Sequence, residues 1–141
     1  MTSIIHVAVG VIISTNHPQQ TQYFLTKRLA DTHQGGKWEF PGGKVEKDES
    51  VAQALARELK EEIDIEVLSC QPLTTINHSY PEKNGSIRKV CLEVFIIDNY
   101  IGEPSAQEGQ GEGWFTLTDL LTLDFPEAND DILNQLKTLN L

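Results

Sequence analysis

Three glutamates, Glu58, Glu61 and Glu62, lie close together in the segment 51–63. On a helix with about 100° between successive residues, they fall within an arc of roughly 100°. Such acidic faces are usually just exposed to solvent, but like charges at i,i+4 destabilise a helix by about a few tenths of a kcal/mol. Carboxylates beside a core also lose hydration. A divalent cation relieves both effects, and oxygen ligands of this kind suit Mg²⁺ or Mn²⁺. The cluster therefore predicts a metal site that can neutralise substrate phosphates.

The segment 51–63 also has the features of an amphipathic helix. Ser50 and Gln53 have the spacing of a capping box, in which each side chain satisfies a backbone N–H at the helix start. At about 100° per residue, one side of the helix is apolar and consists of Val51, Ala52, Leu55, Ala56, Leu59 and Ile63. Glu58 and Glu62 lie at the edge of this side, so we expect their carboxylates beside the core.

A pair of glycines, Gly42 and Gly43, precedes the helix. Glycine permits backbone conformations that expose a carbonyl to a bound ion, so we expect a glycine turn whose carbonyl is a further ligand. Glu49 either supports this loop or is a surface acid favoured by the helix dipole. Arg57 is four residues before Glu61, so we expect it to pair with that carboxylate and orient it.

The spacing of these groups resembles the Nudix box. Gly43 is followed by Glu49 and then by Arg57-Glu58-Leu59-Lys60-Glu61-Glu62. The resemblance implies Mg²⁺-dependent hydrolysis of a nucleoside diphosphate linked to another group, by an α/β/α sandwich with a mixed β-sheet. One position departs, because Asp64 stands where the family usually has glycine. We expect a positive φ at this helix end, which Asp tolerates better than most residues.

The similarity extends over nearly the full chain to the MutT-type 8-oxo-dGTP diphosphatases. The segments that carry it are Ala8-Val9-Gly10, Arg28 with Ala30-Asp31 and His33, Glu39-Phe40-Pro41-Gly42-Gly43-Lys44, Tyr80-Pro81, Gly102-Glu103-Pro104, Glu108-Gly109-Gln110 with Trp114, and Asp124-Phe125-Pro126 with Ala128-Asn129. The resemblance implies that Glu58, Glu61, Glu108 and Arg57 are catalytic. It implies that the metal is held by Gly42, Gly43, Glu58, Glu61, Glu62 and Glu108. It implies that the nucleotide is contacted by Arg28, His33, Glu39, Phe40, Tyr80 and Asn129.

Several of these residues also have an ordinary structural interpretation. Phe40 and Tyr80 are the kind of aromatic residue that fills a core, and Asn129 could be the N-cap of the last helix. Arg28 and Glu108 would otherwise be surface charges. A short insertion at 84–87, relative to the family, leaves open whether Lys83 or Arg88 faces the nucleotide.

The hydropathy pattern predicts strands separated by two helices. We expect strands at 4–13, 23–27, 65–68, 73–80, 90–97 and 114–117, because β-branched and other apolar residues alternate or run together there. Helices are expected at 51–63 and 130–139. The segment 99–113 is rich in glycine and is expected to be a long loop, which in a compact domain is often functional. This order favours a mixed sheet with helices packed on its faces.

Composition limits the function further. The chain has 141 residues, which suits a single Nudix domain spanning 1–141. Its formal net charge of −10 argues against a basic face for nucleic acid polymers or anionic membranes. Cys70 and Cys91 lack metal-ligand spacing, so we expect reduced thiols and a cytoplasmic location. We see no signal peptide and no apolar run long enough to span a membrane, and we expect a monomer.

We therefore predict a Mg²⁺-dependent nucleoside triphosphate pyrophosphohydrolase, with Mn²⁺ as an alternative metal. The resemblance implies that 8-oxo-dGTP is converted to the monophosphate and pyrophosphate, which would protect DNA synthesis from mispairing. One alternative is a related hydrolase acting on another nucleotide, such as a pyrimidine triphosphate. Another is a non-catalytic nucleotide sensor, but loss of a box glutamate would favour that reading and all are present.

Overall fold

A mixed β-sheet forms the centre of the computed structural model, which describes residues 4–14, 20–30, 35–82 and 84–139. Its strands are β1 Ile4–Ile13, β2 Gln22–Lys27, β3 Trp38–Glu39, β4 Gly42–Lys44, β5 Glu66–Pro81, β6 Ile87–Ile101 and β7 Gly111–Thr116. The order is β3-β2-β1-β6-β5, with β4 paired to β1 and β7 paired to β2. Strands β1 and β6 are parallel and the other pairs are antiparallel. The predicted mixed sheet is confirmed.

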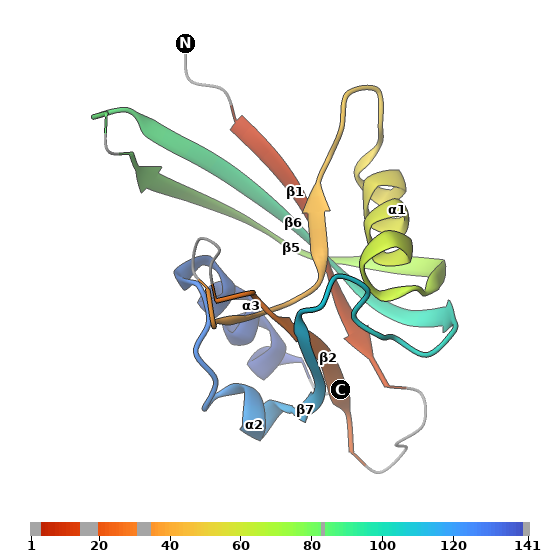
Figure 1. Cartoon of the computed structure of the whole chain (residues 1–141). Coiled ribbons are helices and arrows are strands. Elements are labelled where there is room, and N and C mark those ends of the chain that lie inside the picture. Colours follow the sequence, from red (N-terminus) through yellow and green to blue (C-terminus); the bar gives the residue numbers. More distant parts are fainter. Residues whose placement is uncertain (1–3, 15–19, 31–34, 83, 140–141) are drawn as a thin grey trace.

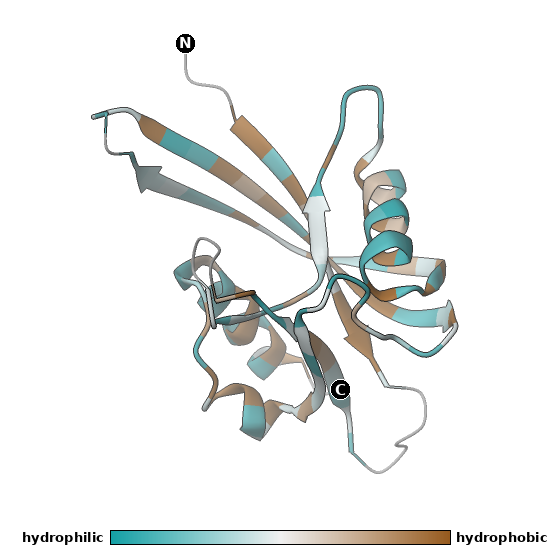
Figure 2. Cartoon of the chain, in the orientation of Figure 1, coloured by the Kyte–Doolittle hydropathy of each residue, from teal (hydrophilic) through white to brown (hydrophobic). Residues whose placement is uncertain are grey.

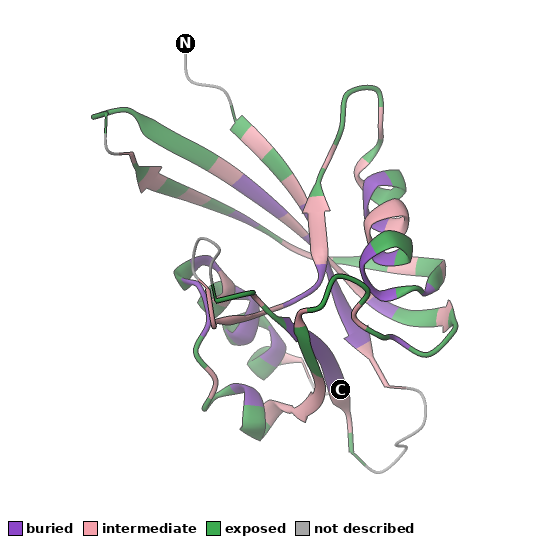
Figure 3. Cartoon of the chain, in the orientation of Figure 1, coloured by how far each residue is buried: buried purple, intermediate pink, exposed green. Residues whose placement is uncertain are grey.

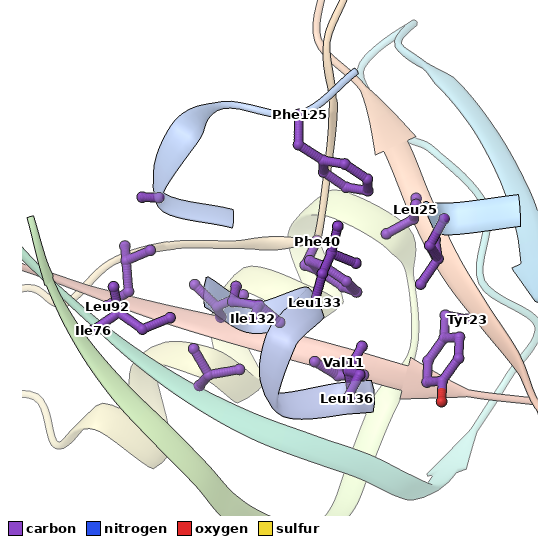
Figure 4. Packing of buried hydrophobic residues seen from close by; sticks show 14 residues of the cluster. Val11, Tyr23, Leu25, Phe40, Ile76, Leu92, Phe125, Ile132, Leu133 and Leu136 are labelled. Carbon is purple, nitrogen blue, oxygen red and sulfur yellow. The ribbon is translucent and has the colours of Figure 1, made fainter. Parts of the chain in front are cut away.

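Helices cover both faces of the sheet (Figure 1). Helix α1 (Val51–Ile63) lies on one face, while α2 (Leu117–Leu120) and α3 (Glu127–Thr138) lie on the other. A separate hydrophobic cluster fills each interface, and Figure 4 shows the cluster beneath α3. The arrangement is the predicted α/β/α sandwich. Within the described ranges, no helix is long and apolar enough to cross a membrane.

Strand β1 contributes side chains to both clusters. Val9 and Val11 pack in the cluster under α3, whereas Ala8 and Ile12 pack in the cluster under α1. Successive side chains of a strand point to opposite faces, and both faces of β1 are covered by a helix. This explains why the strand is apolar at nearly every position and buried over its second half (Figures 2 and 3).

The ends of α1 follow the sequence prediction. Ser50 and Gln53 form the capping box, with side chain to backbone distances of 3.1 and 2.9 Å. Asp64 ends the helix with φ 57° and ψ 44°, and its backbone N–H donates to the carbonyl of Leu59. The expected positive φ at Asp64 is therefore confirmed.

The strands differ from the prediction in their length. The two strands expected at 65–68 and 73–80 form the single edge strand β5, whose register shifts between Val67 and Thr74. These irregularities let the ladder continue through Pro72, which lacks a backbone N–H. Strand β6 extends to Ile101 and β7 begins at Gly111, so the loop expected at 99–113 is shorter. Cross-strand hydrogen bonds determine where these strands begin and end, and the apolar pattern of the sequence does not reveal them.

The last helix begins three residues earlier than predicted. Pro126 is its N-cap, and the backbone N–H of Asn129 donates to the Pro126 carbonyl at 2.9 Å. The alternative interpretation of Asn129 as an N-cap is therefore wrong. Asn129 lies in the first turn of the helix and lines a pocket described below.

Candidate active site

Glu62 is the most buried carboxylate of α1, with 9% of its surface exposed. Its Oε2 accepts a hydrogen bond from the backbone N–H of Gly42 at 3.3 Å. Burial raises the pKa of Glu62 to about 8, and the neighbouring charge of Glu39 adds to the rise. The Gly42 N–H opposes this shift, while Glu108 and Glu58 add to it. Without a cation, this carboxyl group holds its proton at neutral pH.

Arg57 fixes the position of Glu58 and of the loop before α1. Its Nη1 donates to Glu58 Oε1 at 2.9 Å, and its Nε and Nη2 donate to the two oxygens of Glu49 at 2.8 and 3.0 Å. Glu49 also accepts from the backbone N–H of Glu46 at 3.0 Å. The Arg57 hydrogen bond, with this backbone N–H, lowers the pKa of Glu49 to about 2. Glu49 therefore supports the loop, one of its two predicted roles.

Glu61 lies further out than the other two glutamates. Its side chain is 60% exposed, and its closest approach to Arg57 is 3.5 Å. The expected pair therefore exists, but the shorter contacts of Arg57 are made with Glu49 and Glu58. Glu61 faces the rim of the site rather than its interior.

The two glycines are required for a different reason from the one predicted. Gly42 and Gly43 belong to β4, paired with β1, and neither has a positive φ. A Cβ at Gly42 would collide with the backbone of Ala8, and a Cβ at Gly43 would collide with the carboxylate of Glu58. Close packing against a strand and a helix, rather than a turn conformation, demands glycine here.

The loop between β6 and β7 brings Glu108 to the end of α1. The backbone N–H of Gln107 donates to the carbonyl of Glu62 at 2.9 Å. The backbone N–H of Ala106 donates to Glu112 Oε1 at 2.9 Å. Glu112 belongs to no motif, so the sequence offers no signal for its part in holding this loop.

Two adjoining pockets collect most of the predicted site residues. The first, of about 260 Å³, is here called the acid pocket and is lined by Lys27, Arg28, Leu29, Glu39, Gly42, Glu58, Glu62, Glu108 and Gln110. The second, of about 250 Å³, is here called the aromatic pocket and is lined by Val7, Val9, Arg28, Glu39, Phe40, Gly42, Gly43, Lys44, Tyr80, Leu92, Pro126, Ala128 and Asn129. Arg28, Glu39 and Gly42 line both, so one ligand can extend from one pocket into the other.

Arg28 and Glu39 form an ion pair where the pockets meet. Arg28 Nη1 lies 2.7 Å from Glu39 Oε2, and both side chains are about 30% exposed. Burial raises the pKa of Glu39, and the charge and hydrogen bond of Arg28 oppose that rise. The pair places a cationic group beside the acid pocket, where a substrate phosphate can meet it.

The aromatic pocket has an apolar floor and a polar edge. Phe40 is only 4% exposed and its ring stacks on Phe125 with centroids 5.8 Å apart, so it is both a core residue (Figure 4) and a pocket wall. Tyr80 is half-buried, with its ring centroid 4.3 Å from that of His78. Asn129 contributes the polar edge from the first turn of α3.

Two predicted residues fall outside the described part of the chain. His33 lies in the range 31–34, and Lys83 is likewise outside the described residues. The other basic residue of the insertion, Arg88, donates through Nε to Glu82 at 2.8 Å.

The acid pocket fits a divalent cation by its donor chemistry. In the ranges that the structure describes, no three His, Cys, Asp or Glu side chains are already arranged as a metal site. The pocket nevertheless gathers Glu39, Glu58, Glu62 and Glu108. Their mutual repulsion contributes to the raised pKa of Glu62. Hard oxygen donors with excess negative charge match Mg²⁺ or Mn²⁺.

Comparison with known proteins assigns the chain to a family. The NUDIX domain model matches residues 4–136. The chain belongs to the Nudix family. It is 36% identical over 135 residues to an 8-oxo-dGTP diphosphatase of Escherichia coli K12, covering 96% of this chain and 98% of that protein. It is also 36% identical over 108 residues to an E. coli CTP pyrophosphohydrolase, covering 77% and 75% respectively.

A solved structure is similar over the same extent. The MutT structure from the work on Aliivibrio salmonicida and Vibrio cholerae superposes with a TM-score of 0.77 at 34% identity, covering 96% of this chain and 97% of that one. The predicted Nudix fold and hydrolase class are thus confirmed, and Nudix hydrolases generally need a divalent metal.

Proposed function

We propose that this Nudix hydrolase converts 8-oxo-dGTP to 8-oxo-dGMP and pyrophosphate with Mg²⁺, and so removes an oxidised precursor of DNA synthesis. The observation that carries the proposal is the junction of the two pockets at Arg28 and Glu39. One pocket suits a cation with phosphates, and the other suits a flat base with a polar edge. Similarity to the E. coli 8-oxo-dGTP diphosphatase over nearly the whole chain supports this substrate.

The proposed metal ligands are the carboxylates at the end of α1 and in the following loop. Glu58, Glu62 and Glu108 line the acid pocket, and the family resemblance adds Glu61 and a backbone carbonyl of Gly42 or Gly43. A bound Mg²⁺ ion, or Mn²⁺ in its place, supplies charge neutralisation at the phosphates and lowers the pKa of a bound water.

The chain's own groups prepare the site for hydrolysis. Arg57 holds Glu58 by a hydrogen bond of 2.9 Å, and the Gly42 N–H holds Glu62. In the proposed mechanism, Arg28 contacts a phosphate at the junction of the pockets. The family resemblance makes Glu58, Glu61 and Glu108 the candidates for accepting the proton of the attacking water. Glu58 and Glu108 line the acid pocket, whereas Glu61 lies at its rim.

Selection of the oxidised base is proposed for Asn129. Guanine presents two acceptors, O6 and N7, on one edge, whereas its 8-oxo form carries a proton on N7. An asparagine amide has one acceptor and one donor and can pair with both groups of the oxidised base. Phe40 and Tyr80, which line the same pocket, would pack on its ring.

The deciding experiment is a substrate panel with purified protein and Mg²⁺. We expect the highest kcat/KM for 8-oxo-dGTP, a lower value for dGTP, and the monophosphate and pyrophosphate as products. A preference for CTP would instead favour the second candidate function, which the similarity to the E. coli CTP pyrophosphohydrolase supports. Binding of nucleotides without turnover would point to a sensor and refute the proposal.

Substitution of the box glutamates tests the metal site. Glu58→Gln, Glu61→Gln and Glu62→Gln should each lower kcat far more than stability. Near-normal turnover in all three variants would refute the assigned site.

We also propose a cytoplasmic location, which the free thiols of Cys70 and Cys91 support.

A further inference from the structure

Thr26 on β2 carries a buried hydroxyl group that none of the described contacts explains. The residue is 1% exposed, and its Oγ1 has no hydrogen-bond partner among the described residues. Buried hydroxyl groups are nearly always paired, because burying one without a partner is unfavourable. Valine would fill the same volume without this cost. We therefore expect the Thr26 hydroxyl to pair with a polar group on the same face of the sheet.

The position of Thr26 in β2 shows on which face of the sheet its hydroxyl lies. Tyr23 and Leu25 pack in the cluster under α3 (Figure 4), whereas Phe24 packs in the cluster under α1. Because side chains alternate along a strand, Thr26 lies on the same face as Phe24. That face is covered by α1, which carries Glu58 and Glu62.

The neighbours of Thr26 across the sheet are both acidic. Glu39 on β3 and Glu112 on β7 are its direct partners in the two antiparallel ladders. Directly opposite residues point to the same face, with Cβ atoms about 4.5–5.5 Å apart. Glu39 lines the acid pocket, and Glu112 holds the loop that carries Glu108. Thr26 is thus the middle residue of a row of three across the sheet, and the Glu39 end of this row lines the acid pocket.

We propose that Thr26 is a positioning residue of the acid pocket, whose hydroxyl donates a hydrogen bond to Glu39, directly or through one enclosed water, when a cation is bound. In the cation-free chain, Arg28 Nη1 holds Oε2 of Glu39 at 2.7 Å, and the Thr26 hydroxyl has no hydrogen-bond partner among the described residues. Glu39 lines the pocket whose carboxylates would hold the cation, so its carboxylate would turn from the cation-free position toward the hydroxyl when the cation is bound. The inference rests on the proposed cation-dependent function.

The test compares Thr26→Val, which removes only the hydroxyl, with Thr26→Ser, which keeps it. Thermal unfolding is followed with EDTA and then across a Mg²⁺ titration. For Thr26→Val we expect a metal-free Tm equal to or above that of the wild type. We also expect a Mg²⁺ concentration for half-maximal stabilisation raised roughly tenfold, the size of a hydrogen bond to a charged group. Its kcat should fall while KM for the nucleotide stays unchanged, and Thr26→Ser should restore both.

Tyr23→Phe is the matched control, because it removes a hydroxyl from the opposite face of the same strand. Its Mg²⁺ midpoint should equal that of the wild type. An unchanged midpoint in Thr26→Val would overturn the inference. A fall in its metal-free Tm would do the same, because it would show that the hydroxyl is paired without a cation. If Mg²⁺ fails to stabilise even the wild type, the proposed function itself fails.

Discussion

Replacing Glu62 by glutamine should change how stability depends on pH. Glu62 is 9% exposed, and burial raises its pKa from 4.5 to about 8. Below pH 4.5 the carboxyl group is protonated in both the folded and the unfolded chain, so it does not make the free energy of unfolding depend on pH. Between 4.5 and about 8 the folded chain keeps a proton that the unfolded chain has lost, so the free energy of unfolding falls as pH rises.

The magnitude follows from the size of this shift. At about 1.4 kcal/mol per pH unit, the metal-free protein loses about 3 kcal/mol by pH 7 and about 5 kcal/mol above pH 8. Glutamine is neutral at every pH, and its amide oxygen can still accept from the Gly42 N–H. The stability of Glu62→Gln relative to wild type should therefore rise steadily between pH 5 and pH 8 and then level off.

The assay is urea unfolding in EDTA at intervals from pH 5 to pH 9. Groups that do not interact with Glu62 titrate alike in both proteins, so the difference between the two curves reports Glu62 together with its coupling to the neighbouring carboxylates. Glu61→Gln is the control, because it makes the same substitution on the same helix at a side chain that is 60% exposed rather than buried. Parallel curves for Glu62→Gln and wild type would refute the reasoning.

The same experiment with excess Mg²⁺ connects stability to the metal site. A cation binds the ionised carboxylate and releases its proton, so Mg²⁺ should stabilise the wild type increasingly between pH 6 and pH 8. Glu62→Gln should lose most of this gain. An equal gain in the two proteins would place the cation away from Glu62.

Four further substitutions test three separate parts of the structure. Asn129→Ala should reduce the ratio of kcat/KM for 8-oxo-dGTP over dGTP roughly tenfold, the cost of an unmatched buried hydrogen bond; an unchanged ratio would show that the base is read elsewhere. Asp64→Gly should be neutral or stabilise by about 0.5–1 kcal/mol in urea unfolding, because φ is 57° there; a clear loss would reveal a role for the carboxylate. Gly43→Ala should lower kcat at little cost in Tm, since its methyl group meets only the end of the Glu58 side chain and displaces it from Arg57, whereas Gly42→Ala should lower Tm strongly because it meets backbone. Equal losses of Tm would contradict this distinction.

Sequence alone was sufficient where the determinants are local. The capping box of Ser50 and Gln53, the left-handed conformation of Asp64 and the grouping of Glu58 with Glu62 all depend on residues within a turn or two of helix. The fold class followed from the order of the predicted strands and helices and from the resemblance to the Nudix family. Local spacing fixes these features because helix and strand geometry repeat at short, constant intervals.

The ends of elements were less predictable. Pro126 rather than Asn129 begins α3, and β5 runs as one strand through Pro72. Each depends on hydrogen bonds to partners that the local pattern does not name. Phe40 is both a core residue and a pocket wall, whereas the sequence presented these two roles as alternatives.

The electrostatics of the site depend on the tertiary structure alone. Glu39 and Glu108 are far from α1 in sequence, but packing of β3 and the 102–110 loop places them in one pocket with Glu58 and Glu62. Loss of water around Glu62 raises its pKa, and the buried Thr26 hydroxyl has no hydrogen-bond partner among the residues that the structure describes. Sequence determines which groups are available, but desolvation and repulsion depend on distances that exist only after distant segments have packed together.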